Sequence, residues 1–203
     1  KLKKKLGCFL IEDACHAIGS RYLYEKKYHF IGSCKHSDIC VFSFHPVKSI
    51  TTGEGGAVLT NNKNISKRLE IFRSHGIFRK KKYWEYNINE LGYNYRLSDL
   101  NCALGYSQLK KLDIFFKKRS KIFSYYTKKL SPYKQYIFLP NVKNKNNLYH
   151  LFLIGINFNK IKNTKDHFIR HLNKKNIFPQ FHYVPIYKFS FFKNKKIKEF
   201  KGT

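Results

Sequence analysis

Short apolar runs, each followed by polar or glycine residues, recur through the first half of the chain. Cys8–Ile11 is such a run and leads into two acids, the second of which is Asp13. A run of this length is typical of a strand that is buried on both faces of a parallel sheet. Ile39–Phe44 has the same character, and Ala57–Thr60 predicts a shorter strand after a glycine-rich turn. Arg21–Phe30 alternates aromatic and polar residues and predicts a β-hairpin.

Helical spacing of apolar residues follows these strands. The asparagine pair at 61–62 can cap a helix that runs to about Arg73, and Ser98 can cap a second helix. The apolar period of this second helix continues toward Leu130. Strands that alternate with helices predict an α/β fold with a mostly parallel sheet.

The last third of the chain shows a second, weaker alternation. Residues 132–147 are rich in Pro, Asn and Lys and predict a loop. Beyond it, the pattern predicts a strand at Leu151–Ile156, a helix at Lys165–Leu172 and a strand at Ile177–Tyr183. These elements predict a small α+β domain.

Charge is the most unusual feature of the composition, because the 203 residues carry a formal net charge of +29. Such a charge is typical of proteins that bind nucleic acid or anionic membranes. However, only seven of the 41 basic residues are Arg, the residue best suited to paired phosphate or base contacts. Lys, Asn, Ile, Phe and Tyr are abundant and have A/T-rich codons, so a biased genome accounts for much of the charge. A basic nucleic-acid-binding protein remains an alternative, but we expect neither a specific nucleic acid nor a membrane as partner.

The cysteines and the apolar runs bound the cellular context. The five cysteines include no C-x-x-C pair, which speaks against a zinc site or a disulfide framework and favours reduced thiols in the cytoplasm. No apolar run approaches the roughly 18 residues of a membrane helix. The basic start resembles a signal peptide, but acids interrupt its apolar run after five residues. We therefore expect a cytoplasmic protein without a bound metal.

Lys48 is the first candidate for chemistry. It follows the strand at Ile39–Phe44, lies five residues after Ser43 and precedes a glycine-rich turn. Desolvation disfavours the charged form of a lysine, so Lys48 is a candidate nucleophile toward an aldehyde. Asp13 also follows a strand, and parallel strands present their carboxyl ends to a common crevice. Taken alone this pattern is weak, because a lysine after a strand is usually a surface residue.

Four longer blocks make the case more specific. They resemble the DegT/DnrJ/EryC1/StrS family of pyridoxal-phosphate (PLP) dependent sugar aminotransferases. The blocks, in the family's order, are Leu10–Gly19, Phe42–Thr60, Arg73–Gly76 and Leu91–Asp99. The resemblance implies an aspartate-aminotransferase-like fold, PLP fold type I. Residues 1–116 would be the C-terminal part of the PLP-binding large domain, and residues 117–203 part of a small α+β C-terminal domain.

The resemblance also implies roles around the cofactor. Lys48 matches the lysine that forms a Schiff base with PLP, and Asp13 matches the acid that faces the pyridine nitrogen. His16 falls where the family has Gln or His beside the cofactor ring, and Ser43 matches a hydroxyl that binds the cofactor phosphate. Asn94 matches an asparagine that reaches the cofactor of a neighbouring subunit, so a homodimer is expected. Simple packing of His16, local capping by Ser43 and a turn role for Asn94 are the alternatives.

Two further residues are expected near the sugar nucleotide. His182 matches a small-domain motif, although a histidine between aromatic residues often packs in a core. Arg96 is expected to meet an anionic group of the substrate. Within the family, Phe44–Lys48 and Glu90–Asp99 most resemble enzymes that aminate C4 of a UDP-linked 4-keto-6-deoxy sugar on the pseudaminic acid route, with glutamate as donor. A dehydratase branch of the same fold is an alternative, but it carries His in place of the lysine.

One departure from the family concerns the cofactor phosphate. The family has an earlier segment with a Gly-Thr pair at a helix N-terminus, a natural phosphate site. No segment of this chain matches it. We therefore expect the chain to be a fragment that is inactive by itself.

Overall fold

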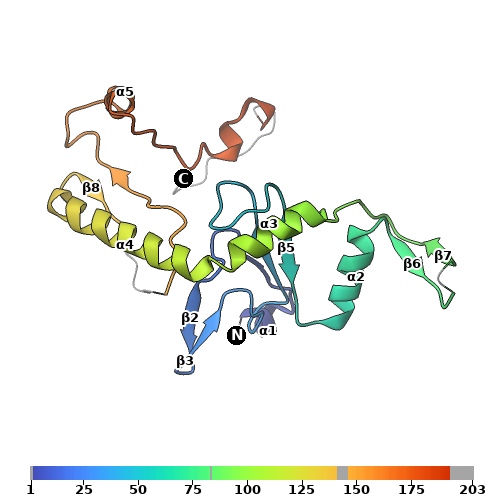
Figure 1. The fold of residues 1–203 in the computed structure, drawn as a ribbon. Helices are drawn as coiled ribbons and strands as arrows, with labels where there is room; N and C mark the ends of the chain where they lie inside the picture. The colour runs from blue at the N-terminus through green and yellow to red at the C-terminus, as the bar shows by residue number, and fades with distance from the viewer. Residues whose placement is uncertain (1, 83, 141–145, 193–203) are drawn as a thin grey trace. The chain divides into compact units, whose positions relative to one another are not determined.

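The computed structural model describes residues 2–82, 84–140 and 146–192, and its chain divides into two compact units (Figure 1). Unit 1 consists of Lys1–Lys134 and Leu139–Ile154, and unit 2 consists of Gln135–Phe138 and Gly155–Thr203. The division expected at residues 116 and 117 concerns the domains of the complete enzyme and stays a prediction. Within this chain, that point lies inside a long helix of unit 1.

A three-stranded sheet forms the centre of unit 1. Its strands are β1 (Ile11–Asp13), β4 (Ile39–Ser43) and β5 (Gly56–Leu59), in the order β1-β4-β5. The pairing of β1 with β4 is parallel and sets Asp13 opposite Val41. The pairing of β4 with β5 is antiparallel, so the described sheet is mixed. All three expected strands are present, but the first begins at Ile11 instead of Cys8 and includes both acids.

The remaining strands form two-stranded pairs. The expected hairpin is confirmed as β2 (Arg21–Tyr24) and β3 (Lys27–Phe30). A second hairpin, β6 (Ile77–Arg79) with β7 (Tyr86–Ile88), was not expected, because neither strand is long enough to show an alternating pattern. In unit 2, β8 (Ile137–Phe138) pairs with β9 (Gly155–Ile156).

The expected helices are present, with one interruption. The side chain of Asn62 accepts hydrogen bonds at the start of α2 (Lys63–Arg73), and Ser98 caps α3 (Asp99–Leu109) in the same way. The apolar period expected to continue from α3 is broken at residues 110–111, after which α4 begins (Leu112–Leu130). The other helical segments are α1 (Leu2–Leu6), η1 (Ser131–Tyr133), α5 (Lys165–Lys174), η2 (Ile186–Lys188) and η3 (Ser190–Phe192).

Two strand predictions in the last third were wrong. Of Leu151–Ile156, only the last two residues pair, as β9. Ile177–Tyr183 forms no strand, and its apolar side chains are largely exposed, Phe178 by 72%. Pro179 removes a backbone donor from the middle of this run, and no neighbouring strand in the described residues supplies a ladder. Residues 141–145 of the expected loop lie outside the described residues.

The core of unit 1 lies around β4. Ala14, Cys34, Cys40 and Phe42 are buried together, and burial is the main reason why the pKa of Cys40 rises to about 12. Gly32 packs so closely on this cluster that an added Cβ would lie 2.7 Å from the Phe42 ring. Its φ of +92° also favours glycine, so both the backbone and the packing require this residue.

A segment from later in the chain returns to this core. Leu148 is only 2% exposed, and its backbone N–H donates to Ser20 Oγ at 2.9 Å. The Arg21 N–H donates in turn to the carbonyl oxygen of Asn146 at 2.8 Å. These two hydrogen bonds hold residues 146–148 against the chain that follows β1. We call residues 146–150 the return segment.

We expect Leu148→Ala to destabilise unit 1 by about 2–5 kcal/mol, because the substitution removes buried methyl groups and leaves a cavity. Leu153→Ala is the matched control, since Leu153 is 56% exposed; its effect should stay within about 0.5 kcal/mol. Urea denaturation of the two variants and the parent chain measures both values. Equal losses would show that the return segment does not stabilise the core.

Candidate active site

Asp13 stands at the carboxyl end of β1, within electrostatic reach of His16 and Lys48. Its pKa is lowered mainly by hydrogen bonds from the thiol and the backbone N–H of Cys15, the latter 3.1 Å from Oδ1. Burial opposes this lowering, and electrostatic interactions with His16 and Lys48 add smaller contributions to it. The carboxylate therefore stays ionised at neutral pH. The structure thus brings together three residues that the sequence marked: Asp13, His16 and Lys48.

The thiol of Cys15 interacts with the same two residues, Asp13 and Lys48. The pKa of its thiol is raised, first by the hydrogen bond to Asp13, then by burial and by the carboxylate charge. Lys48 opposes this shift electrostatically. The spacing of the cysteines did not identify Cys15 as a site residue. Its interaction with Asp13 depends on the turn that follows β1.

Lys48 lies in a loop that backbone hydrogen bonds close at its base. The Phe44 N–H donates to Gly55 O at 2.8 Å, and the Thr52 N–H donates to Phe44 O at 3.0 Å. The two residues after Lys48 are buried, and the lysine itself is half-buried. A loop fixed in this way holds the lysine near the carboxyl ends of β1 and β4.

Ser43 is the last residue of β4 and is half-buried. Its Oγ accepts a hydrogen bond from the His45 N–H at 3.5 Å, which is a long contact. It lies opposite Gly56 in the antiparallel register. Ser43 thus shares the carboxyl end of the sheet with Asp13, as the sequence predicted.

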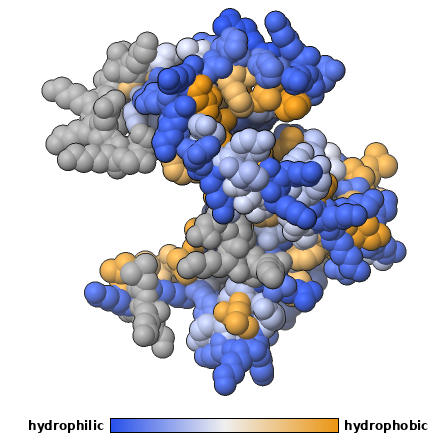
Figure 2. Space-filling view, turned by 90° about the vertical axis from the view of Figure 1, so that its left-hand side faces the viewer, coloured by the Kyte–Doolittle hydropathy of each residue, from blue (hydrophilic) through white to orange (hydrophobic). Residues whose placement is uncertain are grey.

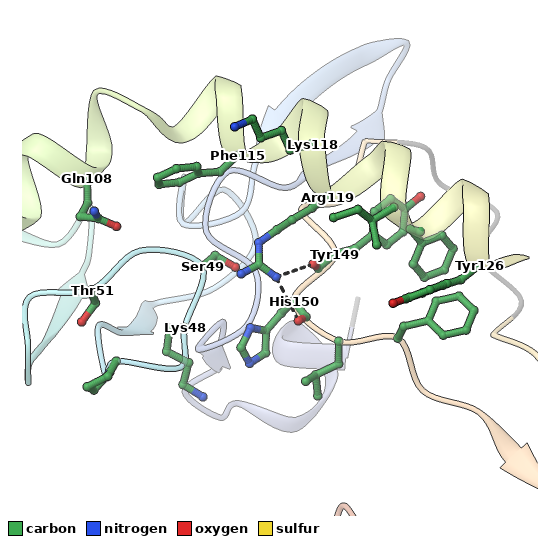
Figure 3. A pocket seen from close by; sticks show the side chains of 15 residues that line it. Lys48, Ser49, Thr51, Gln108, Phe115, Lys118, Arg119, Tyr126, Tyr149 and His150 are labelled. Atoms are coloured by element: carbon green, nitrogen blue, oxygen red, sulfur yellow. Dashed lines mark hydrogen bonds between the residues drawn. The ribbon is translucent and has the colours of Figure 1, made fainter. Parts of the chain in front are cut away.

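A pocket of about 600 Å³ opens beside the Lys48 loop, entirely within unit 1 (Figure 3). Its charged lining residues are Lys48, Lys118 and Arg119, with no acid among the lining residues. Aromatic residues from α4 and from residues 149–152 form much of the remaining wall. This combination suits an anionic ligand with a flat ring.

Arg119 and His150 are site residues that the sequence did not mark. Arg119 Nη1 donates to the carbonyl oxygens of Tyr149 and His150, at 3.1 and 3.2 Å, and Figure 3 shows both bonds. The ring centroid of His150 lies 4.2 Å from that of His16. No local motif could reveal these contacts, because they depend on the path of the return segment.

The remaining predicted site residues are Asn94, Arg96 and His182. Asn94 and Arg96 are exposed, and Asn94 pairs with Ser74 in an isolated β-bridge. His182 belongs to unit 2, is exposed and lies 4.3 Å from the ring of Tyr183. The contacts described for unit 1 do not join Asn94 or Arg96 to Asp13 or Lys48, so the roles of all three stay predictions.

The described residues bear on two other kinds of site. Among the described residues, no group of three or more His, Cys, Asp or Glu side chains is arranged to hold a metal ion. The helices in the described part of the chain lack the length or the apolar character needed to cross a bilayer. Apolar side chains do reach the surface amid hydrophilic ones, as the face in Figure 2 shows.

Curated proteins with related sequences act on nucleotide sugars, according to their names. The UDP-4-amino-4,6-dideoxy-N-acetyl-beta-L-altrosamine transaminase of Campylobacter jejuni is 44% identical over 192 residues, which cover 95% of this chain and 49% of the relative. The Helicobacter pylori protein of the same name is 36% identical over 195 residues. This chain spans about half the length of these relatives.

Solved structures agree. Helicobacter pylori PseC, described as an aminotransferase involved in the biosynthesis of pseudoaminic acid, superposes with a TM-score of 0.84 at 33% identity, over 98% of this chain and 52% of that one. S. venezuelae DesV superposes with a TM-score of 0.78 at 27% identity, over 98% and 49%. These neighbours confirm the expected PLP fold type I. Residues 1–203 also match the family model, and the chain belongs to the DegT/DnrJ/EryC1/StrS aminotransferase family.

Proposed function

We propose that this chain carries the catalytic lysine of a PLP-dependent aminotransferase that acts on a nucleotide sugar. The observation that carries the proposal is the juxtaposition of Asp13, His16 and Lys48 at the carboxyl ends of β1 and β4. PLP, when bound, supplies a ring that withdraws electrons from the substrate carbon. The family membership supports the same cofactor.

The residues present fit this cofactor chemically. An acid with a lowered pKa stays ionised and can hold a pyridine nitrogen in its protonated form, which is the role of Asp13. His16 stands beside Asp13, where it would flank the ring. Ser43 offers a hydroxyl for the phosphate, and Asn94 would reach the phosphate of a second subunit's cofactor in a homodimer.

Lys48 has two roles in this proposal. Its amine holds the cofactor covalently between turnovers, and it then moves a proton as general base and general acid. The loop closed by Phe44 and Gly55 fixes the backbone that carries this amine. Pre-organisation of this kind lowers the entropy cost of the proton transfer.

We propose C4 of a UDP-linked 4-keto-6-deoxy sugar as the acceptor and glutamate as the amino donor. The names of the Campylobacter and Helicobacter relatives support the acceptor. His182 and Arg96 would contact the sugar nucleotide, with residues 1–116 in the large domain and 117–203 in the small one. We also propose a cytoplasmic location, which the lack of a C-x-x-C pair or disulfide framework in the sequence supports.

The first test concerns Lys48 in a chimaera, made by joining this chain to the part of the Campylobacter jejuni relative that it does not match. Borohydride should fix the cofactor on Lys48, and peptide mapping should find the label there. Lys48→Ala should abolish amino transfer, whereas the matched control Lys63→Ala, at the start of α2, should not change it. A label on any other lysine of the chain would remove Lys48 from its role.

Asp13→Asn in the same chimaera should lower turnover by more than ten- to a hundredfold. A charge-assisted hydrogen bond contributes about 1.5–3 kcal/mol in the ground state, and the ring needs it more as it accepts electron density. The pKa of Cys15 should fall toward its usual value of 9.0, because its main raising cause is the Asp13 carboxylate. Cys15 should therefore be alkylated faster at pH 8, where more of it is thiolate.

Steady-state kinetics and peptide-resolved alkylation measure these two effects separately. Glu70→Gln, an exposed acid on α2, is the matched control and should leave both unchanged. Unaltered turnover in Asp13→Asn would remove Asp13 from the cofactor site, whatever happens to Cys15.

We expect the 203-residue chain alone to show no amino transfer when PLP, glutamate and a UDP-4-keto sugar are supplied. Its β1 is an edge strand of the described sheet, where Ile11 is 62% and the preceding Phe9 76% exposed. Unpaired apolar edges of this kind favour association over a well-formed site. Product formation by the chain alone, followed by chromatography, would contradict this expectation.

A further inference from the structure

The return segment is held from two sides. On one side, Ser20 Oγ and the Arg21 N–H bond its backbone at Leu148 and Asn146, both within 3 Å. On the other side, Arg119 of α4 bridges the carbonyl oxygens of Tyr149 and His150. The backbone at residue 150 is therefore fixed against both the chain after β1 and the middle of α4.

Packing adds to these hydrogen bonds. Leu148 is buried almost completely, and the ring of Tyr149 stacks on Phe123 of α4 with a centroid distance of 3.8 Å. Two neighbours of His150 are thus anchored in the core or on the helix. His150 lies between these anchors and the Lys48 loop, on the wall of the pocket (Figure 3).

The ring of His150 meets the ring of His16 at 4.2 Å, with an angle of 49° between their planes. His16 is exposed and lies three residues after β1, in the loop that leads to β2. The contact with a fixed ring limits the orientations that the His16 imidazole adopts. His16 in turn contributes to the lowered pKa of Asp13, so the two histidines continue the site from Asp13 to the pocket.

We propose that His150 is a positioning residue for His16, and that Arg119 sets the position of His150. The proposal rests on the function proposed above, because His16 matters only if it flanks a cofactor ring. His150 acts through the contact between the two imidazoles and holds His16 in the orientation that the cofactor meets. Arg119 acts one step further away, by fixing the backbone that carries His150.

The test uses the chimaera described above, with the dissociation constant of PLP measured by titration of its visible absorbance. His150→Ala should raise this constant about two- to tenfold, the range expected for the loss of one aromatic pair. His150→Phe keeps a ring and should recover most of the lost affinity. Arg119→Lys, which offers one donor group instead of a planar fork, should raise the constant in the same direction.

A double-mutant cycle separates positioning from general destabilisation. In a His16→Ala background, His150→Ala should change the dissociation constant less than twofold, because its target is gone. Thermal unfolding of each variant checks that the fold is intact. His150→Phe serves as the folded comparison if His150→Ala is unstable.

The outcomes distinguish this inference from the proposed function. If the parent chimaera does not attach PLP to Lys48, the proposed function fails and the positioning role fails with it. If the parent attaches PLP but His150→Ala binds it equally well, only the positioning role is overturned. An undiminished effect of His150→Ala in the His16→Ala background would overturn it as well, because His150 would then act without His16.

Discussion

The parallel pairing of β1 with β4 is the constraint from which the rest of the candidate site follows. It sets Asp13 opposite Val41, so the acid and the loop that carries Lys48 both lie at the carboxyl ends of the strands. An antiparallel pairing would place them at opposite ends of the strands. The hydrogen bonds at the base of the Lys48 loop then fix the backbone from which the lysine extends. The turn that follows β1 supplies the hydrogen bonds from Cys15 that are the main cause of the lowered pKa of Asp13.

The positions of charged residues near the site are more informative than the net charge of the chain. The composition alone, with a net charge of +29, left a basic nucleic-acid-binding protein as an alternative, although biased codon usage accounts for much of that charge. Near the site, however, what matters is where charge is placed. The Asp13 carboxylate lies within electrostatic reach of His16 and Lys48, and the neighbouring pocket has cations but no acid in its lining. The local arrangement is informative about ligands, whereas the sum over the chain is not.

Much of unit 1 could be predicted from the sequence, because its signals are local. The caps at Asn62 and Ser98, the hairpin after Ser20 and the apolar run of β4 each depend on neighbouring residues. The strand predicted at 177–183 was wrong, because an apolar run needs a partner strand and Pro179 weakens any ladder. Arg119 and His150 were not predicted as site residues, because their contacts also depend on distant parts of the chain. Their contacts depend on where a segment far along the chain returns, and no spacing in the sequence encodes that path.

The bond between Leu148 and Ser20 spans 128 residues of sequence, and this separation has a consequence for the timing of synthesis. A ribosome adds roughly 5–20 residues per second, so on the order of ten seconds pass between the two ends of this contact. By the end of that interval the strands of the sheet and the Lys48 loop have been synthesised. Until then, His16 lacks its neighbouring ring. The two halves of the histidine pair therefore meet late. Until the return segment is made, the chain after β1 lacks the hydrogen bonds that join Ser20 and Arg21 to residues 148 and 146.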